Sequence, residues 1–177
     1  MDLYKDLIKL LTRYQLDNHG KRVGRLSVYI GRELGVGVSE SSLYQAGLLH
    51  DIGKTKVDQN ILQRTGPITD KERTEIQAHP ILGFERLNRV GVNQLCLDAC
   101  LFHHERLDMS GYPFGLIGDC IPIVAKIVAI ADVYDAMTTN RDRPARSKGE
   151  AINVLRGSGF DQTMVNCLIK MPIALNL

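Results

Sequence analysis

Apolar residues recur every three or four positions along most of the chain, the spacing that predicts amphipathic helices. Residues 122–139 are rich in β-branched side chains and would also suit a buried strand, but the stretch is too long for one and no other segment is predicted to pair with it. The pattern predicts helices over residues 3–14, 19–34, 39–53, 69–79, 81–90, 93–106 and 122–139, with two more short helices within 147–171.

Local signals mark where several of these helices begin and end. Ser39 is a suitable N-cap, and Thr69 followed by Glu72 has the spacing of a capping box. Pro80 directly follows His79, so one helix ends or kinks at that histidine. We therefore expect an all-α fold, a compact helical bundle of about seven or eight helices.

Composition favours one globular domain spanning residues 1–177, since the chain is 44% hydrophobic and 24% charged. The longest apolar stretch, 121–134, is interrupted by a proline and two charges, so no membrane span is expected. The N-terminus opens with acidic residues and lacks a secretory pattern, which predicts a cytoplasmic protein. A formal net charge of +2 argues against DNA or RNA polymers as partners.

The four cysteines are few and irregularly spaced, so in this compartment we expect them to stay reduced. Cys96 and Cys100 are one helical turn apart, but both lie in an apolar run. We therefore interpret them as buried core thiols rather than metal ligands.

Most of the five histidines lie near ends of predicted helices, at intervals of about one helix plus a connection. Such a pattern is typical of a metal site built between facing helices. Two pairs, His50-Asp51 and His103-His104, are adjacent in sequence, and neighbours on a helix diverge by about 100°, so a pair can reach two centres. Imidazole and carboxylate without thiolate suit iron, manganese, zinc, cobalt or nickel, and indicate hydrolysis or oxygen chemistry.

In this pattern the chain resembles the HD-GYP domains, a branch of the HD metal-dependent phosphohydrolases, over about residues 15–171. The resemblance rests on residues 19–23, 48–54, 66–69, 79–83, 103–108, 111–113 and 131–138. It implies two divalent metal ions, iron most often and manganese as the alternative. It further implies that cyclic di-GMP is hydrolysed to pGpG and/or GMP through a metal-bridging hydroxide.

The resemblance also implies which residues bind the metals. One ion is expected at His19, His50, Asp51 and Asp132, and a second at His79, His103 and His104, with Asp51 bridging the two. Asp51 is thereby expected to be a catalytic residue. Lys54, three residues further on, is expected to be catalytic as well, because its ammonium can bind the substrate phosphate and carry its developing charge.

Other substrate contacts are predicted in two segments. Arg143 and Arg146 belong to a basic run that also contains Arg141 and Lys148, and guanidinium groups pair with phosphate or stack on guanine. Tyr112, in a Gly-Tyr-Pro segment, can either stack on a base or form a docking surface for a partner.

The chain departs from the family pattern in places. Met109 stands where a glycine is usual, which predicts a stiffer loop or the loss of a positive-φ conformation. Gln15 stands where some members carry a glutamate associated with a third metal, so two metals are expected. The stretch 138–146 is two residues longer than usual, which leaves the substrate less determined than the metals.

Two alternatives therefore stay open. The same chemistry can act on another cyclic dinucleotide, such as cyclic GMP-AMP, or on a mononucleotide. The chain can also be an inactive signalling module that binds a nucleotide or a diguanylate cyclase. A sensor or receiver protein is a further candidate partner.

Overall fold

The computed structural model describes residues 3–140, 144–157 and 159–172, and within these ranges it contains helices but no strand. The helices are, in chain order, α1 (Leu3–Arg13), α2 (Asp17–Leu34), α3 (Glu40–Leu49), η1 (Ile52–Lys56), α4 (Gln59–Leu62), α5 (Asp70–Gln77), α6 (His79–Val90), α7 (Gln94–Phe102), η2 (Gly118–Cys120), α8 (Ile123–Thr138), α9 (Lys148–Arg156) and α10 (Gln162–Lys170). The all-α prediction is confirmed. The single turn α4 has no counterpart in the sequence prediction, because four residues are too short to show apolar periodicity.

The helix predicted over 69–79 ends at Gln77, and His79, which was expected to end it, begins α6 with Pro80 in its first turn. Two other predicted helices end further from their expected bounds, in both cases just before a histidine. The helix predicted over 39–53 stops at Leu49, and a tighter 3₁₀ turn, η1, follows; the helix predicted over 93–106 stops at Phe102. The physical reason is similar in both. His50 Nδ1 lies 2.6 Å from the carbonyl oxygen of Gly47, and His103 Nδ1 bonds carbonyls of the last turn of α7, so the imidazoles satisfy carbonyl groups at the helix ends.

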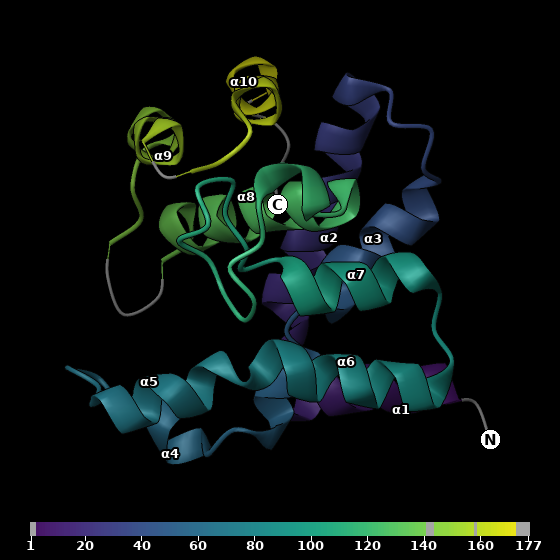
Figure 1. Ribbon diagram of the computed structural model, residues 1–177, viewed down its shortest axis with the longest axis vertical. Coiled ribbons are helices and arrows are strands. Elements are labelled where there is room, and N and C mark those ends of the chain that lie inside the picture. The colour runs from purple at the N-terminus through teal and green to yellow at the C-terminus, as the bar shows by residue number, and fades with distance from the viewer. Residues whose placement is uncertain (1–2, 141–143, 158, 173–177) are drawn as a thin grey trace.

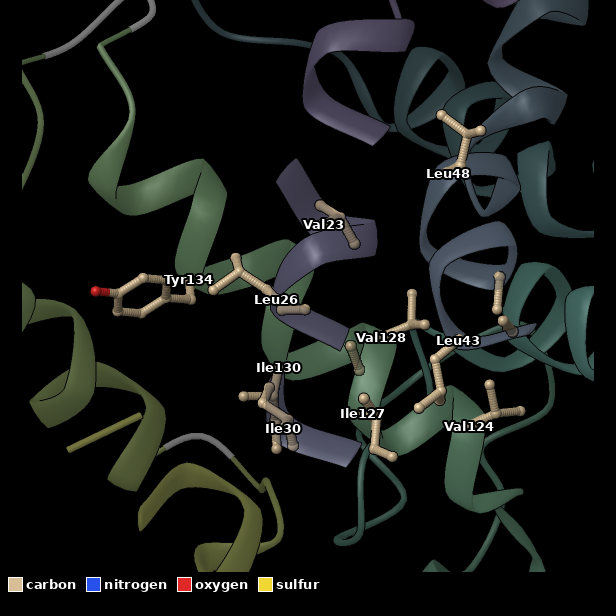
Figure 2. Close-up of a cluster of buried hydrophobic side chains, with 14 of the residues drawn as sticks. Val23, Leu26, Ile30, Leu43, Leu48, Val124, Ile127, Val128, Ile130 and Tyr134 are labelled. Atoms are coloured by element: carbon tan, nitrogen blue, oxygen red, sulfur yellow. The ribbon is translucent and has the colours of Figure 1, made fainter. Parts of the chain in front are cut away.

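The core lies around α8, which packs against α2, α3 and α7 (Figure 1). Figure 2 shows apolar side chains of α2, α3 and α8 meeting in one cluster, which includes Val23, Leu26, Ile30, Leu43, Val124, Ile127, Val128 and Ile130. Since α8 is buried around most of its circumference, it has no broad polar face. This is why its sequence is compatible with a buried strand as well.

Helices α2 and α3 approach each other so closely that their backbones touch. A Cβ at Gly47 would lie 2.6 Å from the Cα of Gly24, and a Cβ at Gly24 would lie 2.7 Å from the carbonyl oxygen of Tyr44. Only glycine fits such a contact. The close packing brings His19 of α2 and His50, which follows α3, to a ring-centroid separation of 5.2 Å.

The remaining helices lie around this centre. In Figure 1, α9 and α10 lie beside each other at one end of the molecule, and α5 and α6 follow one another on the opposite side. No helix in the described ranges is both long and apolar enough to cross a membrane.

Candidate metal centre

The candidate ligands come from five parts of the chain and meet in the interior. His19 belongs to α2 and Asp132 to α8, while His79 is the first residue of α6. The two adjacent pairs follow helix ends: His50-Asp51 after α3, and His103-His104 after α7. All seven side chains lie in two groups whose donor atoms are within 4.8 Å of one another: His19, His50 and Asp132 in one, and Asp51, His79, His103 and His104 in the other.

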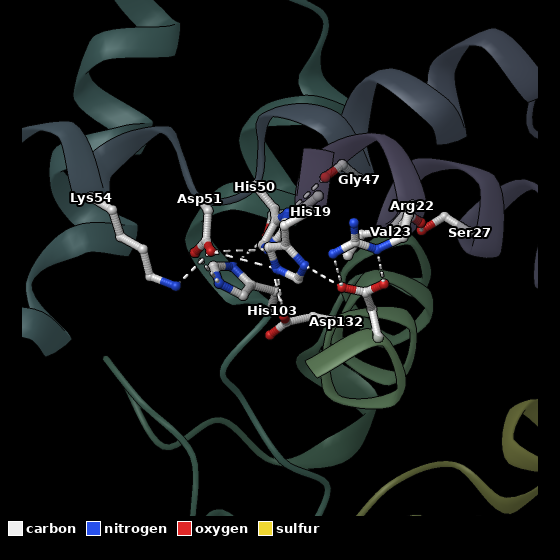
Figure 3. A network of polar contacts seen from close by, with 12 residues as sticks. His19, Arg22, Val23, Ser27, Gly47, His50, Asp51, Lys54, His103 and Asp132 are labelled. Carbon is white, nitrogen blue, oxygen red and sulfur yellow. Dashed lines mark hydrogen bonds and ion pairs between the residues drawn. The ribbon is translucent and has the colours of Figure 1, made fainter. Parts of the chain in front are cut away.

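The carboxylate of Asp51 lies between the two groups. Its Oδ2 is 3.4 Å from Nε2 of His50 and 3.8 Å from Nε2 of His19. Its Oδ1 is 3.2 Å from Nε2 of His79 and 3.7 Å from Nε2 of His103. One oxygen therefore faces each group, which is the arrangement a bridging carboxylate needs. Figure 3 shows Asp51 near His19, His50 and His103.

The histidine rings are oriented by hydrogen bonds on the side away from the site. The Nδ1–H of His50 donates to the carbonyl of Gly47, and that of His79 donates to the carbonyl of Ile76 at 2.7 Å. Because a carbonyl can only accept, each of these Nδ1 atoms carries a proton. The Nε2 atoms are thereby left to face the middle of the site, and a metal-ligating imidazole is oriented in the same way by an N–H donated from its other nitrogen.

The donor atoms in the middle of the site fit divalent cations. Nε2 of His50, Oδ1 of Asp51 and Nε2 of His104 are buried and have no hydrogen-bond partner among the described residues. Buried polar atoms are almost always paired, so three such atoms in one place need an explanation. Nitrogen and oxygen donors of this kind bind iron, manganese, zinc and related ions.

Burial and the neighbouring charges shift the pKa values of these groups. Burial by itself would lower the pKa of His50, but the carboxylates of Asp51 and Asp132 outweigh it and raise that pKa to about 10. Burial, together with the neighbouring histidines, lowers the pKa of His103 to about 4. The pKa of His104 is lowered by burial in the same way. His103 and His104 are therefore uncharged at neutral pH, with a nitrogen lone pair available for a cation.

The sequence analysis missed a pair of residues that supports His19. Asp135 is 1% exposed, and its Oδ2 lies 2.6 Å from Nδ1 of His19. Arg22 binds the same carboxylate with two nitrogens, at 2.6 and 3.0 Å. The available signal was the three-residue spacing of Asp132 and Asp135, which puts both carboxylates on one face of α8.

The predicted substrate-binding residues do not all lie at the candidate metal centre. Lys54 lies at the site, where its Nζ is 2.5 Å from Oδ2 of Asp51. Tyr112 is stacked on the ring of His104, with centroids 4.5 Å apart. Arg146 is exposed, and Arg143 lies outside the described residues.

Lys148, from the same basic run, is engaged elsewhere. Its ammonium donates to the carbonyl oxygens of Ile169 and Met171, at 3.0 and 2.6 Å. Cations at this position satisfy the last carbonyls of a helix, here α10. The ammonium of Lys148 is therefore bound to the end of α10.

The expectation that Met109 excludes a positive φ is wrong, because the residue adopts φ 64°. Gln15, at φ 58°, is exposed in the connection after α1.

The interpretation of Cys96 and Cys100 as buried core thiols is confirmed. Burial raises the pKa of Cys96 to about 12 and raises that of Cys100 as well.

Comparison with known proteins finds a family model described as HD domain, which matches residues 3–162. A cyclic di-GMP phosphodiesterase of Pseudomonas aeruginosa is 41% identical over 161 residues, which cover 86% of this chain and 38% of the relative. A 3′3′-cGAMP-specific phosphodiesterase of Vibrio cholerae is 38% identical over 140 residues, which cover 78% of this chain and 32% of the relative. The chain thus spans less than half the length of these two relatives.

Among solved structures, an HDG"Y"P protein from Bdellovibrio bacteriovorus superposes with a TM-score of 0.72 at 23% identity. The superposition covers 87% of this chain and 51% of that one. At this level of identity the likeness shows a shared helical fold.

Proposed function

Because this chain belongs to the HD domain family, we propose that it is a metal-dependent phosphodiesterase that hydrolyses cyclic di-GMP to pGpG and/or GMP. The observation that carries the proposal is the position of Asp51, whose two oxygens face two separate groups of buried ligands. The name of the relative that is 41% identical, and the resemblance of the motifs to HD-GYP domains, favour cyclic di-GMP as the substrate.

In this proposal two divalent ions bind, iron in the first place and manganese as the alternative. His19, His50 and Asp132 would hold one ion, His79, His103 and His104 would hold the other, and Asp51 would contact both. Bound divalent cations lower the pKa of water towards neutrality and polarise phosphoryl oxygens. The protein's own contribution is to hold the imidazoles and carboxylates in fixed orientations.

Lys54 is proposed to bind the phosphate that reacts. Its half-buried ammonium already lies at the edge of the site, against Asp51, so a short movement can bring it to a phosphate oxygen. A cation there stabilises the charge that develops on non-bridging oxygens during hydrolysis. Arg143, Arg146 and Tyr112 remain predicted contacts for the rest of the substrate.

A second candidate substrate is 3′3′-cyclic GMP-AMP, which the name of the Vibrio cholerae relative favours. The third reading is an inactive module that binds a nucleotide or a diguanylate cyclase. We also propose a sensor or receiver protein as a partner, within the cytoplasm. The orphaned ligand atoms favour an enzyme over an inactive module, because a docking surface has no use for buried unpaired donors.

The test is anaerobic incubation of Fe(II)-loaded or Mn(II)-loaded protein with cyclic di-GMP and, separately, with 3′3′-cyclic GMP-AMP. Products are followed by chromatography beside a control in which His50 and Asp51 are both replaced by alanine. Formation of pGpG or GMP only with the intact site is the expected result. Turnover of cyclic GMP-AMP alone would transfer the proposal to that substrate, and no turnover by fully metal-loaded protein would contradict both.

A further inference from the structure

His104 differs from the other candidate metal-ligating histidines in what orients its ring. Each of the others has an Nδ1 that pairs with a backbone carbonyl or with a carboxylate; these are His19, His50, His79 and His103. The side chain of His104 makes no hydrogen bond within the part of the chain that the structure describes, and its Nε2 is one of the buried unpaired atoms. Among the described residues, its orientation therefore comes from packing.

Three aromatic rings surround that of His104. The rings of His79 and His103 lie 4.9 and 4.1 Å away, between centroids, and both belong to the same ligand group. The third is Tyr112, whose ring lies nearly parallel to that of His104, at 4.5 Å and 17°. Tyr112 is thus the one neighbour in this stack that is not itself a candidate ligand, and its ring is stacked on one face of the imidazole.

The loop that carries Tyr112 is clamped against the residues that follow α7. The Tyr112 amide donates to the carbonyl oxygen of His104 at 3.2 Å. A Cβ at Gly111 would lie 2.5 Å from the same carbonyl oxygen and 2.4 Å from the Cα of Glu105, so only glycine allows this approach. The position of the tyrosine ring is therefore coupled to the position of His104.

A buried carboxylate holds the far side of this loop. Glu105 is 3% exposed, and its two oxygens accept hydrogen bonds from the backbone amides of Phe114 and Leu116, at 2.8 and 2.9 Å. Because Glu105 follows His104 directly, one short segment bears both the ligand and the group that fixes the covering loop. Charge-assisted bonds of this kind are strong and geometrically selective.

We propose that Tyr112 is a positioning residue, whose ring holds the imidazole of His104 in its metal-binding orientation, and that Glu105 positions Tyr112. The inference rests on the proposed metal centre. It assigns the tyrosine a role that requires its ring and not its hydroxyl, and that is separate from base stacking or partner docking.

The experiment is a titration of metal-free protein with Mn²⁺, comparing Tyr112→Leu, Tyr112→Phe and a control, Phe114→Leu. Phe114 is in the same loop and 57% exposed, and its ring contacts Phe102 rather than a ligand. Tyr112→Leu is expected to weaken one of two Mn²⁺-binding events by about 10- to 100-fold and to leave the other unchanged, as loss of an orienting neighbour does. Tyr112→Phe and Phe114→Leu should bind Mn²⁺ as the unaltered protein does.

Two further variants complete the test. Glu105→Gln keeps the shape of the side chain but points an NH₂ group at one of the two amides, and should weaken the same event by about tenfold. It replaces Tyr112→Leu as the deciding variant if that protein does not fold. His104→Ala should abolish the same event.

The outcomes separate the inference from the function on which it rests. If His104→Ala leaves both Mn²⁺-binding events intact, the proposed second ion site is wrong and the inference is wrong with it. If His104→Ala removes one event while Tyr112→Leu and Glu105→Gln keep both at full affinity, only the positioning role is refuted. Equal loss in Tyr112→Phe would assign the effect to the hydroxyl and overturn the argument from stacking.

Discussion

Replacing Gly53 with alanine perturbs the contact that places one half of the metal centre against the other. Gly53 lies in η1, between Asp51 and Lys54 in the sequence. This turn packs directly against α6. A Cβ at this position would lie 1.9 Å from the carbonyl oxygen of His79 and 2.6 Å from the amide nitrogen of Gly83. Both neighbours are backbone atoms and cannot rotate away, so η1 and α6 must separate by roughly 1 Å.

The expected magnitude follows from that displacement. Forcing an extra methyl group into a close-packed interior costs about 1–3 kcal/mol of unfolding free energy. For a protein of this size each kcal/mol lowers Tm by roughly 2–4 °C. The same movement changes the 3.2 Å separation of Asp51 Oδ1 from His79 Nε2, so the affinity of that group for Mn²⁺ should fall about 10- to 100-fold.

The assay combines urea unfolding of the metal-free protein with the Mn²⁺ titration. The matched control is Gly149→Ala in α9, because, apart from its chain neighbours and the backbone of its own helix, no described atom lies within 4 Å of a Cβ at that position. Alanine there should leave Mn²⁺ binding unchanged and alter the unfolding free energy by no more than about +1 kcal/mol, through its higher helix propensity. If Gly53→Ala unfolds at the same urea concentration as the unaltered protein and binds Mn²⁺ with the same affinity, the argument from backbone contact is refuted.

Three other predictions use the same measurements or simple chemistry. Asp135→Asn removes the charge that holds His19 and should weaken Mn²⁺ binding at the His19 group about tenfold or more; unchanged affinity would show that the ring is held without it. Met109→Gly should raise the unfolding free energy by up to about 1 kcal/mol in urea, since glycine adopts φ 64° without the Cβ penalty; a lower value would contradict this. Burial raises the pKa of Cys96 to about 12, so its reactive thiolate forms only as the pH approaches that value. At pH 8.5 iodoacetamide should therefore modify exposed Cys120 and leave Cys96 unmodified, which mass spectrometry can determine.

Much of the secondary structure could be predicted from the sequence, because helix periodicity and caps are local. The capping box at Thr69 and Glu72 is present as expected, and the apolar pattern of 122–139 corresponds to α8. Candidate ligands could also be proposed, since imidazole and carboxylate chemistry belongs to the residue type. The prediction extended two helices through His50 and beyond Phe102. It could not include the hydrogen bonds from the His50 and His103 rings to backbone carbonyls, which end these helices.

The chain by itself thus determined an all-α fold and a set of histidines and acids placed near helix ends. Only the tertiary structure decided how these side chains divide into two groups and what orients each ring. Asp135 and Arg22 are 113 residues apart, and the stack of Tyr112 on His104 depends on a loop held by Glu105. The physical reason is that periodicity constrains which face of a helix is buried, whereas the contact of two side chains depends on how separate helices pack.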